Sequence, residues 1–108
     1  MARASGTRFV FDSGGLPALD GALDLAVAGV ETGGAAHNRR FVRPSLTVAD
    51  GVAGELVTLA HDPQTSGGLL AAGPAARVEA VDAALADAGV ERWWVGRAEA
   101  GEPAVVLA

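Results

Sequence analysis

The chain of 108 residues contains no cysteine and no lysine. Without cysteine it can form neither disulfides nor thiolate metal ligands. Without lysine, and with a net charge of −5, it is a poor candidate for wrapping nucleic acid, because that role needs many cations to neutralise phosphates. No apolar run approaches the roughly 18 residues of a membrane-spanning helix, so we expect no membrane partner. The first residues also lack the apolar stretch of a secretory signal, which predicts a cytoplasmic protein.

Half of the residues are hydrophobic and 19% are charged, which is typical of a globular chain. The length is enough for one hydrophobic core, so we expect residues 1–108 to form a single domain. The negative charge is uneven, because acidic residues exceed arginines only in residues 55–108. Arg39, Arg40 and Arg43 form the one basic cluster. Two interpretations stay open: a solvated surface, or a group that attracts an anionic ligand.

The order of apolar and turn-forming residues predicts a mixed α/β (α+β) fold in which helices are layered on a β-sheet. Residues 31–51 form the least regular region, apart from a short extended segment at 46–48. Adjacent Trp93 and Trp94 would point to opposite faces of a strand, one of them packing under a helix. The predicted strands are 8–12, 69–72, 92–99 and 104–107, and the predicted helices are 17–28, 52–59 and 74–88.

Two of these helices end in nearly the same residues, LAVAGVE at 25–31 and LADAGVE at 85–91. Gly29 and Gly89 hold the position just past the helix end, where a left-handed residue is common. We interpret the similarity as one helix-ending motif used twice, because the matching stretch is too short for a repeat architecture.

The densest group of polar and turn-forming residues lies at 62–70, with the sequence DPQTSGGLL. Gly67 and Gly68 allow a close backbone approach, and successive N–H groups in such a loop can bind an anion. No Walker-type lysine or GxGxxG pattern accompanies it. A structural turn and a ligand loop are therefore equally compatible with these residue types. The candidate ligand-loop residues are Asp62, Gln64, Thr65, Ser66, Gly67 and Gly68.

Common catalytic arrangements fit less well. Ser66 does not match the G-x-S-x-G nucleophile elbow, and proximity of His61 to Asp62 in sequence does not make a catalytic triad. His37 and His61 with scattered acids give no metal-ligand pattern, so we expect no metal site and interpret both as loop residues.

The string DPQTSGGLL resembles the signature of the C-terminal domain of selenophosphate synthetase (selenide, water dikinase), in the aminoimidazole ribonucleotide synthetase-like superfamily. The segment LPALDGALDLA at 16–26 resembles the family's "LP-x-x-x-G-A" helix. Gly29, Val30, Gly33, Gly34 and Asn38 resemble its "G-V-x-x-G-G-x-x-x-N" segment. The matching pieces run in the family's order from about residue 16 to 96. Ala35 departs from the pattern, which usually has Ser or Thr there.

The resemblance implies an enzyme that makes selenophosphate, AMP and phosphate from ATP, selenide and water, with Mg²⁺. It implies that the 62–68 loop closes the phosphate cleft, and that Gly33, Gly34 and Asn38 help to shape this cleft. The family's N-terminal half supplies a reactive Cys or selenocysteine, a nearby Lys and the metal-binding Asp residues. Because this chain has no Cys or Lys, we expect a C-terminal fragment that contributes no catalytic residue of its own and is inactive alone.

The partners that the resemblance implies are the N-terminal ATP-binding half and, in the full-length enzyme, a second copy in a homodimer. Two alternatives remain. One is a non-catalytic α/β module that binds a small anion. The other is the equivalent domain of a related superfamily enzyme, such as thiamine monophosphate kinase or aminoimidazole ribonucleotide synthetase.

Overall fold

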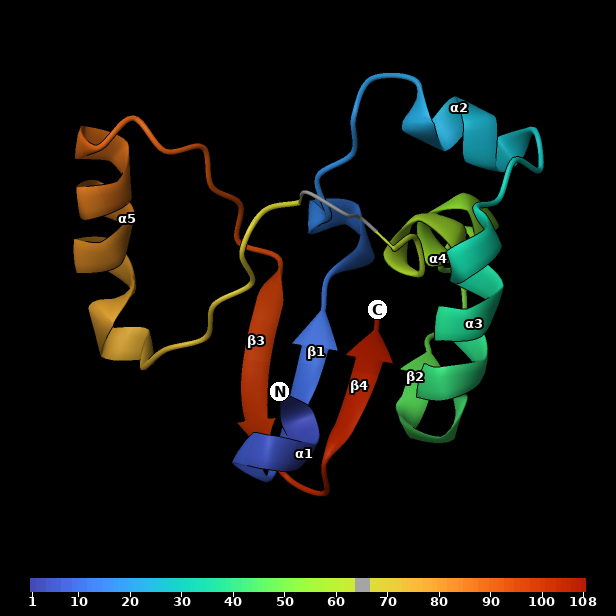
Figure 1. Cartoon of the computed structure of the whole chain (residues 1–108). Helices are drawn as coiled ribbons and strands as arrows, with labels where there is room; N and C mark the ends of the chain where they lie inside the picture. The colour runs from blue at the N-terminus through green and yellow to red at the C-terminus, as the bar shows by residue number, and fades with distance from the viewer. Residues whose placement is uncertain (64–66) are drawn as a thin grey trace.

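The computed structural model of the chain describes residues 1–63 and 67–108. In these residues a four-stranded mixed sheet has the order β2-β4-β1-β3 (Figure 1). Strand β1 pairs antiparallel with β3 and parallel with β4, and β2 pairs parallel with β4. The predicted α/β (α+β) class is confirmed. The strands are β1 (Thr7–Phe11), β2 (Leu46–Val48), β3 (Gly96–Ala100) and β4 (Ala104–Leu107).

The two inner strands carry most of the core. Strands β1 and β4 each have a neighbour on both sides. Residues 9–11 of β1 and all of β4 are continuous apolar runs, as expected where both faces of a strand are covered. Phe9 and Val10 of β1 and Leu107 of β4 are buried. Ala35, from a helix, is the other buried apolar residue among those described. The predictions of strands at 8–12 and 104–107 are confirmed within a residue.

The longer helices lie beyond the two edge strands of the sheet, whereas the short α1 lies at the ends of the inner strands (Figure 1). Figure 1 shows α2, α3 and α4 grouped beyond the β2 edge, whereas α5 stands apart on the β3 side. None of the helices in the described part of the chain has the length and apolar character needed to cross a bilayer. The α-helices are α1 (Ala2–Ser5), α2 (Ala22–Val27), α3 (Gly33–Val42), α4 (Gly54–Ala60) and α5 (Val78–Asp87), and short 3-10 turns cover Ser13–Gly15, Arg43–Ser45 and Ala75–Arg77.

The repeated helix-ending motif is confirmed in detail. The N–H of Val30 donates to the Leu25 carbonyl at 2.9 Å, and the N–H of Val90 donates to the Leu85 carbonyl at the same distance. The intervening glycines, Gly29 and Gly89, have φ of 81° and 67°. Both ends are therefore Schellman motifs, which satisfy carbonyl groups that the helix leaves without a partner.

Two of the predictions for residues 17–51 were wrong. The helix expected from Pro17 begins only at Ala22, because Gly21 adopts a left-handed conformation before it and Leu19 is 83% exposed. The region expected to be irregular contains the ten-residue helix α3. Its glycine pair falls in the first turn, and the alanines and arginines that follow favour a helix.

The predicted strand at 69–72 was also wrong, since these residues have no strand partner and Leu69 is fully exposed. An apolar run forms a strand only where a neighbouring strand can pair with it. The strand predicted at 92–99 is β3, which starts at Gly96 rather than at residue 92. Trp93 and Trp94 precede it and are both about half exposed, at 53% and 55%, so neither is buried under a helix.

We name residues 69–94, which contain α5, the α5 arm. One ion pair within it joins Arg92 to Asp82 of α5. Arg92 donates two hydrogen bonds to the Asp82 carboxylate, at 2.8 and 2.9 Å. The hydrogen bond from the Arg92 guanidinium holds the pKa of Asp82 below its ordinary value. Because a lowered carboxyl pKa favours the folded form above the unfolded pKa, this contribution is lost as the pH falls.

We predict that Gly96→Ala weakens the β1–β3 pairing. Gly96 pairs with Phe11, and a Cβ at Gly96 would overlap the Val10 carbonyl oxygen. The strands would have to separate locally, so the free energy of unfolding in urea should fall by about 2–4 kcal/mol. Gly73→Ala is the control, because a Cβ there meets open space and should change stability by about 1 kcal/mol at most. Equal effects of the two substitutions would contradict the close approach.

Candidate functional site

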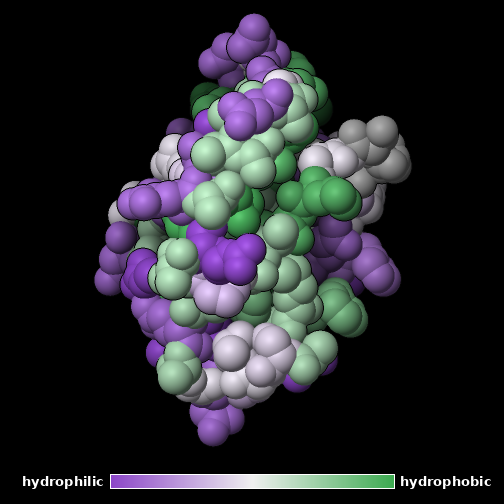
Figure 2. Space-filling view, turned by 90° about the vertical axis from the view of Figure 1, so that its left-hand side faces the viewer, coloured by the Kyte–Doolittle hydropathy of each residue, from purple (hydrophilic) through white to green (hydrophobic). Residues whose placement is uncertain are grey.

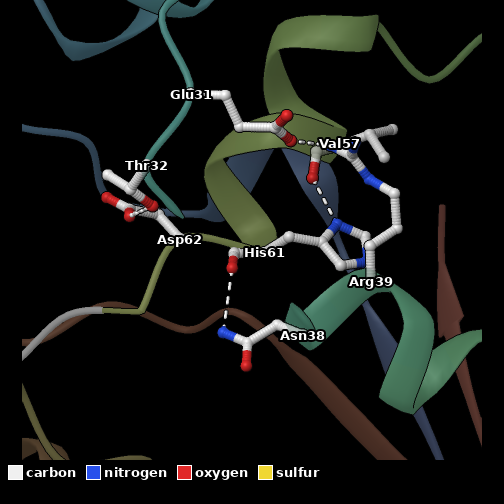
Figure 3. Close-up of polar contacts among 7 residues, drawn as sticks. All are labelled: Glu31, Thr32, Asn38, Arg39, Val57, His61 and Asp62. Atoms are coloured by element: carbon white, nitrogen blue, oxygen red, sulfur yellow. Dashed lines mark hydrogen bonds and ion pairs between the residues drawn. The ribbon is translucent and has the colours of Figure 1, made fainter. Parts of the chain in front are cut away.

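Two segments that are distant in sequence meet at one junction, between the start of α3 and the link that follows α4. The Thr32 hydroxyl donates to Asp62 Oδ1 at 2.8 Å. The Asn38 side-chain amide donates to the His61 carbonyl at 3.0 Å (Figure 3). We name this contact the α3–link junction, consisting of Thr32, Gly34, Asn38 and residues 61–63. It brings three of the predicted site residues, Gly34, Asn38 and Asp62, into one place.

The two glycines at the start of α3 differ in their surroundings. A Cβ built on Gly34 would overlap the ring of Pro63, whereas a Cβ on Gly33 meets nothing within 4 Å. Gly34 therefore allows the link to pack directly on the helix. Gly33 has no such packing role in the described structure.

The remaining predicted loop residues divide into two groups. Gln64, Thr65 and Ser66 lie outside the described residues. Gly67 and Gly68 are exposed, and a Cβ on Gly68 meets nothing within 4 Å. Packing of the described residues therefore does not explain why position 68 is a glycine.

Asp62 has a partner that the sequence did not suggest. An Asp at the start of a turn often accepts backbone N–H groups of the same turn. Among the described residues, the partner of the Asp62 carboxylate is the Thr32 hydroxyl, 30 residues away. The bond is exposed to solvent, so it orients the carboxylate more than it stabilises the fold.

A cavity of about 140 Å³ adjoins Asp62 and Thr32. Glu31 also lines it but is paired with Arg39, so the Asp62 carboxylate supplies the negative charge that disfavours a phosphate group there. Within residues 1–63 and 67–108, no group of three or more His, Cys, Asp or Glu side chains is placed to hold a metal ion. The other residues that line the cavity at Asp62 are apolar or hydroxyl-bearing: Leu25, Ala26, Val30, Ala35, Thr58 and Leu59.

Ala35, where the resembled family usually has a hydroxyl, is 1% exposed and lines this cavity. A methyl group suits such an apolar position, since a hydroxyl here would need a hydrogen-bond partner.

His61 is the residue that sequence reasoning misjudged. It was expected in a loop, but it caps the end of α4 and is 5% exposed. Its Nδ1 lies 2.6 Å from the carbonyl oxygen of Val57. A carbonyl can only accept, so Nδ1 carries the proton. The bond to the carbonyl four residues earlier depends on the position of His61 at the end of α4, and the sequence carried no separate signal of its burial.

The arginine cluster is partly neutralised. Arg39 forms an ion pair with Glu31 at 2.6 Å, and both side chains are substantially exposed (Figure 3). An exposed pair of this kind contributes little to stability. It does cancel one positive charge, so Arg39 is a weaker attractor for an anion than its charge alone suggests.

Comparison with known proteins supplies relatives for most of the chain. It is 38% identical over 96 residues to the selenide, water dikinase of Nitratidesulfovibrio vulgaris strain Miyazaki F, a match that covers 89% of this chain and 27% of the relative. The Hildenborough strain's selenide, water dikinase is 34% identical, covering 99% of the chain and 31% of the relative. That of Pseudomonas straminea is 36% identical, covering 99% and 30%. No protein-family model matches the chain. The chain thus spans about three tenths of its relatives' length.

We predict opposite effects for two adjacent substitutions in α3. Gly34→Ala should lower the free energy of unfolding by about 1–3 kcal/mol, because the new methyl group displaces Pro63. Gly33→Ala should be neutral or raise it by up to about 1 kcal/mol, because it stiffens the unfolded chain and meets no neighbour. Thermal unfolding followed by circular dichroism measures both. If Gly34→Ala proves as stable as Gly33→Ala, the α3–link junction is looser than described.

Proposed function

Because this chain belongs to the selenide, water dikinase family over about three tenths of its relatives' length, we propose that it is the C-terminal domain of a selenophosphate synthetase. The activity is that of the longer enzyme, which makes selenophosphate, AMP and phosphate from ATP, selenide and water in the cytoplasm. The observation that carries the proposal is the identity of 38% with such an enzyme over 96 residues.

The part that we assign to this chain is to close the phosphate cleft with the loop at 62–68. The α3–link junction supports this assignment, because hydrogen bonds at His61 and Asp62 hold the start of the loop against α3. Gly67 and Gly68 are exposed beyond it. A loop that is anchored at its base and exposes backbone N–H groups suits an anionic ligand. Asp62 then serves to position the loop, and the glycines approach the phosphates.

The family's N-terminal half is the partner that we propose for the α5 side of the chain. Figure 2 shows apolar side chains spread over this face between polar ones. Large exposed apolar sets of this kind mark interaction surfaces. A second copy of the complete enzyme would complete a homodimer. The exposed apolar residues of the α5 arm are Leu69, Leu70, Val78, Val81, Val90, Trp93 and Trp94.

ATP and Mg²⁺ are assigned to the N-terminal half. Phosphoryl transfer needs metal ions and cationic groups to hold several phosphate charges in line. The described residues do not fit a magnesium ion, since they form no cluster of metal-ligating side chains. The chain also has no lysine. The isolated chain should therefore be inactive.

A chimera tests the proposed function. The matched portion of the Nitratidesulfovibrio vulgaris Miyazaki F enzyme is replaced by these 108 residues, and AMP release is measured with and without selenide. We expect selenide-dependent AMP and a selenophosphate signal by phosphorus NMR from the chimera, and neither from the chain alone. The parent enzyme without its matched portion is the control. A folded, ATP-binding chimera that shows no selenide-dependent AMP release would favour the equivalent domain of a related ATP-dependent enzyme.

The loop's role is tested in the same chimera by two glycine substitutions. Gly68→Val should lower the rate of AMP release at least tenfold, because a side chain would keep the backbone from the phosphates. Gly73→Val is the matched control, since both positions are exposed and have open space around a Cβ. Equal rates of AMP release for the two variants would contradict the proposal that the loop closes the phosphate cleft. If the isolated chain binds phosphate and Gly68→Val abolishes that binding, an anion-binding module becomes the better description.

A further inference from the structure

A second cavity, of about 310 Å³, lies beside His61 and shares no lining residue with the cavity at Asp62. Aliphatic side chains from β2 and α4 form one part of its wall, and two arginines form another. The lining residues are Arg39, Arg43, Leu46, Val48, Val57 and His61.

The unusual feature of this cavity is a buried polar atom. His61 Nδ1 donates its proton to the Val57 carbonyl, which leaves Nε2 as a bare acceptor while the ring is neutral. Nε2 is buried and has no hydrogen-bond partner among the described residues. Buried polar atoms are nearly always paired, so an unpaired one beside a cavity indicates a group that is bound there.

The charges around the ring select the kind of ligand. Arg39 is paired with Glu31, whereas Arg43 has no ion-pair partner in the described part of the chain. The cavity therefore has about one uncompensated positive charge, which disfavours a metal cation and suits a single anionic group. The other titratable or charged groups of α3 and α4 are His37, Arg40 and Glu55, which are not among the lining residues.

We propose that this cavity binds a small monocarboxylic acid with a short hydrocarbon chain. One carboxyl oxygen pairs with the Arg43 guanidinium, and the other shares a proton with His61 Nε2. The hydrocarbon chain lies against Leu46, Val48 and Val57. Three aliphatic side chains and one free arginine suit such a ligand better than a fully polar anion with several charges.

The proton in this arrangement has a measurable consequence. Neutral His61 has no proton on Nε2, so the complex forms either from the protonated acid and the neutral ring or from the carboxylate and the imidazolium. Both routes give the same complex, with one proton shared between the carboxyl oxygen and Nε2. Binding of the carboxylate to the neutral ring therefore takes up one proton from solution, and it should weaken as the pH rises.

Titration of the 108-residue chain with butyrate, followed by nitrogen–proton correlation NMR, tests the proposal. We expect saturable shifts at Val57, His61 and Arg43 at pH 6, and a dissociation constant at least tenfold larger at pH 8. Inorganic phosphate and 1-butanol are the comparison probes, and each should bind at least tenfold more weakly at pH 6. Absence of saturable shifts with butyrate overturns the proposal, and so does tighter binding of phosphate.

A pair of variants separates a specific site from general charge attraction. Arg43→Gln should weaken butyrate binding at least tenfold. Arg40→Gln removes the same charge from an exposed α3 position outside the cavity and should leave binding unchanged. Equal weakening by both variants overturns the site.

The imidazole nitrogens can be observed directly, which avoids a substitution at buried His61. Long-range nitrogen–proton spectra should show the proton on Nδ1 in the free chain at pH 8. A shift of the Nε2 resonance on adding butyrate at pH 6 is expected. An unchanged Nε2 resonance at saturating butyrate overturns the role of His61. This site stands apart from the proposed enzyme cleft, so its failure would leave the proposed function intact.

Discussion

The packing of the Pro63 ring on Gly34 is the constraint on which the site depends. It brings the link after α4 so close to α3 that the helix has no room for a side chain at this position. The hydrogen bonds from Thr32 to Asp62 and from Asn38 to the His61 carbonyl then fix the orientation of the link. Because these contacts join segments more than 20 residues apart, they also determine where the glycine loop leaves the domain.

The α3–link junction places the adjacent residues His61 and Asp62 at two different cavities. Asp62 faces a cavity with a second carboxylate, Glu31, whereas His61 faces a cavity with two arginines. The Glu31–Arg39 ion pair connects them. A single link thus presents a negative surface on one side and a positive one on the other. Anions are therefore expected at the His61 cavity or at the loop's backbone N–H groups, and not at the Asp62 carboxylate.

The α5 side of the molecule has a different character. Helix α5 stands away from the sheet, and its valines remain exposed together with Trp93 and Trp94 (Figure 1). The buried apolar core of the described residues is small by comparison and is centred on β1, β4 and Ala35. The chain also spans only about three tenths of its relatives. These facts support the proposal that the α5 side contacts the N-terminal half.

Local chemistry was enough for the features that depend on neighbouring residues. The inner strands β1 and β4, the extended segment at 46–48 and the two Schellman motifs at Gly29 and Gly89 follow from apolar runs and glycine positions. The relationship to selenide, water dikinases was also readable from the DPQTSGGLL string and its companions. Within each of these motifs the determining residues lie within a few positions of one another.

Tertiary structure decided what depends on distant partners. Residues 69–72 are as apolar as a strand, but no strand lies beside them to accept their hydrogen bonds. The glycine pair at 33–34 lies in a region predicted to be irregular, but it forms the first turn of α3, where Gly34 packs against Pro63. His61 gave no sign of burial, and the partner of Asp62 lies 30 residues away. Sequence patterns report local preference, whereas hydrogen bonding and burial are settled by residues that only folding brings together.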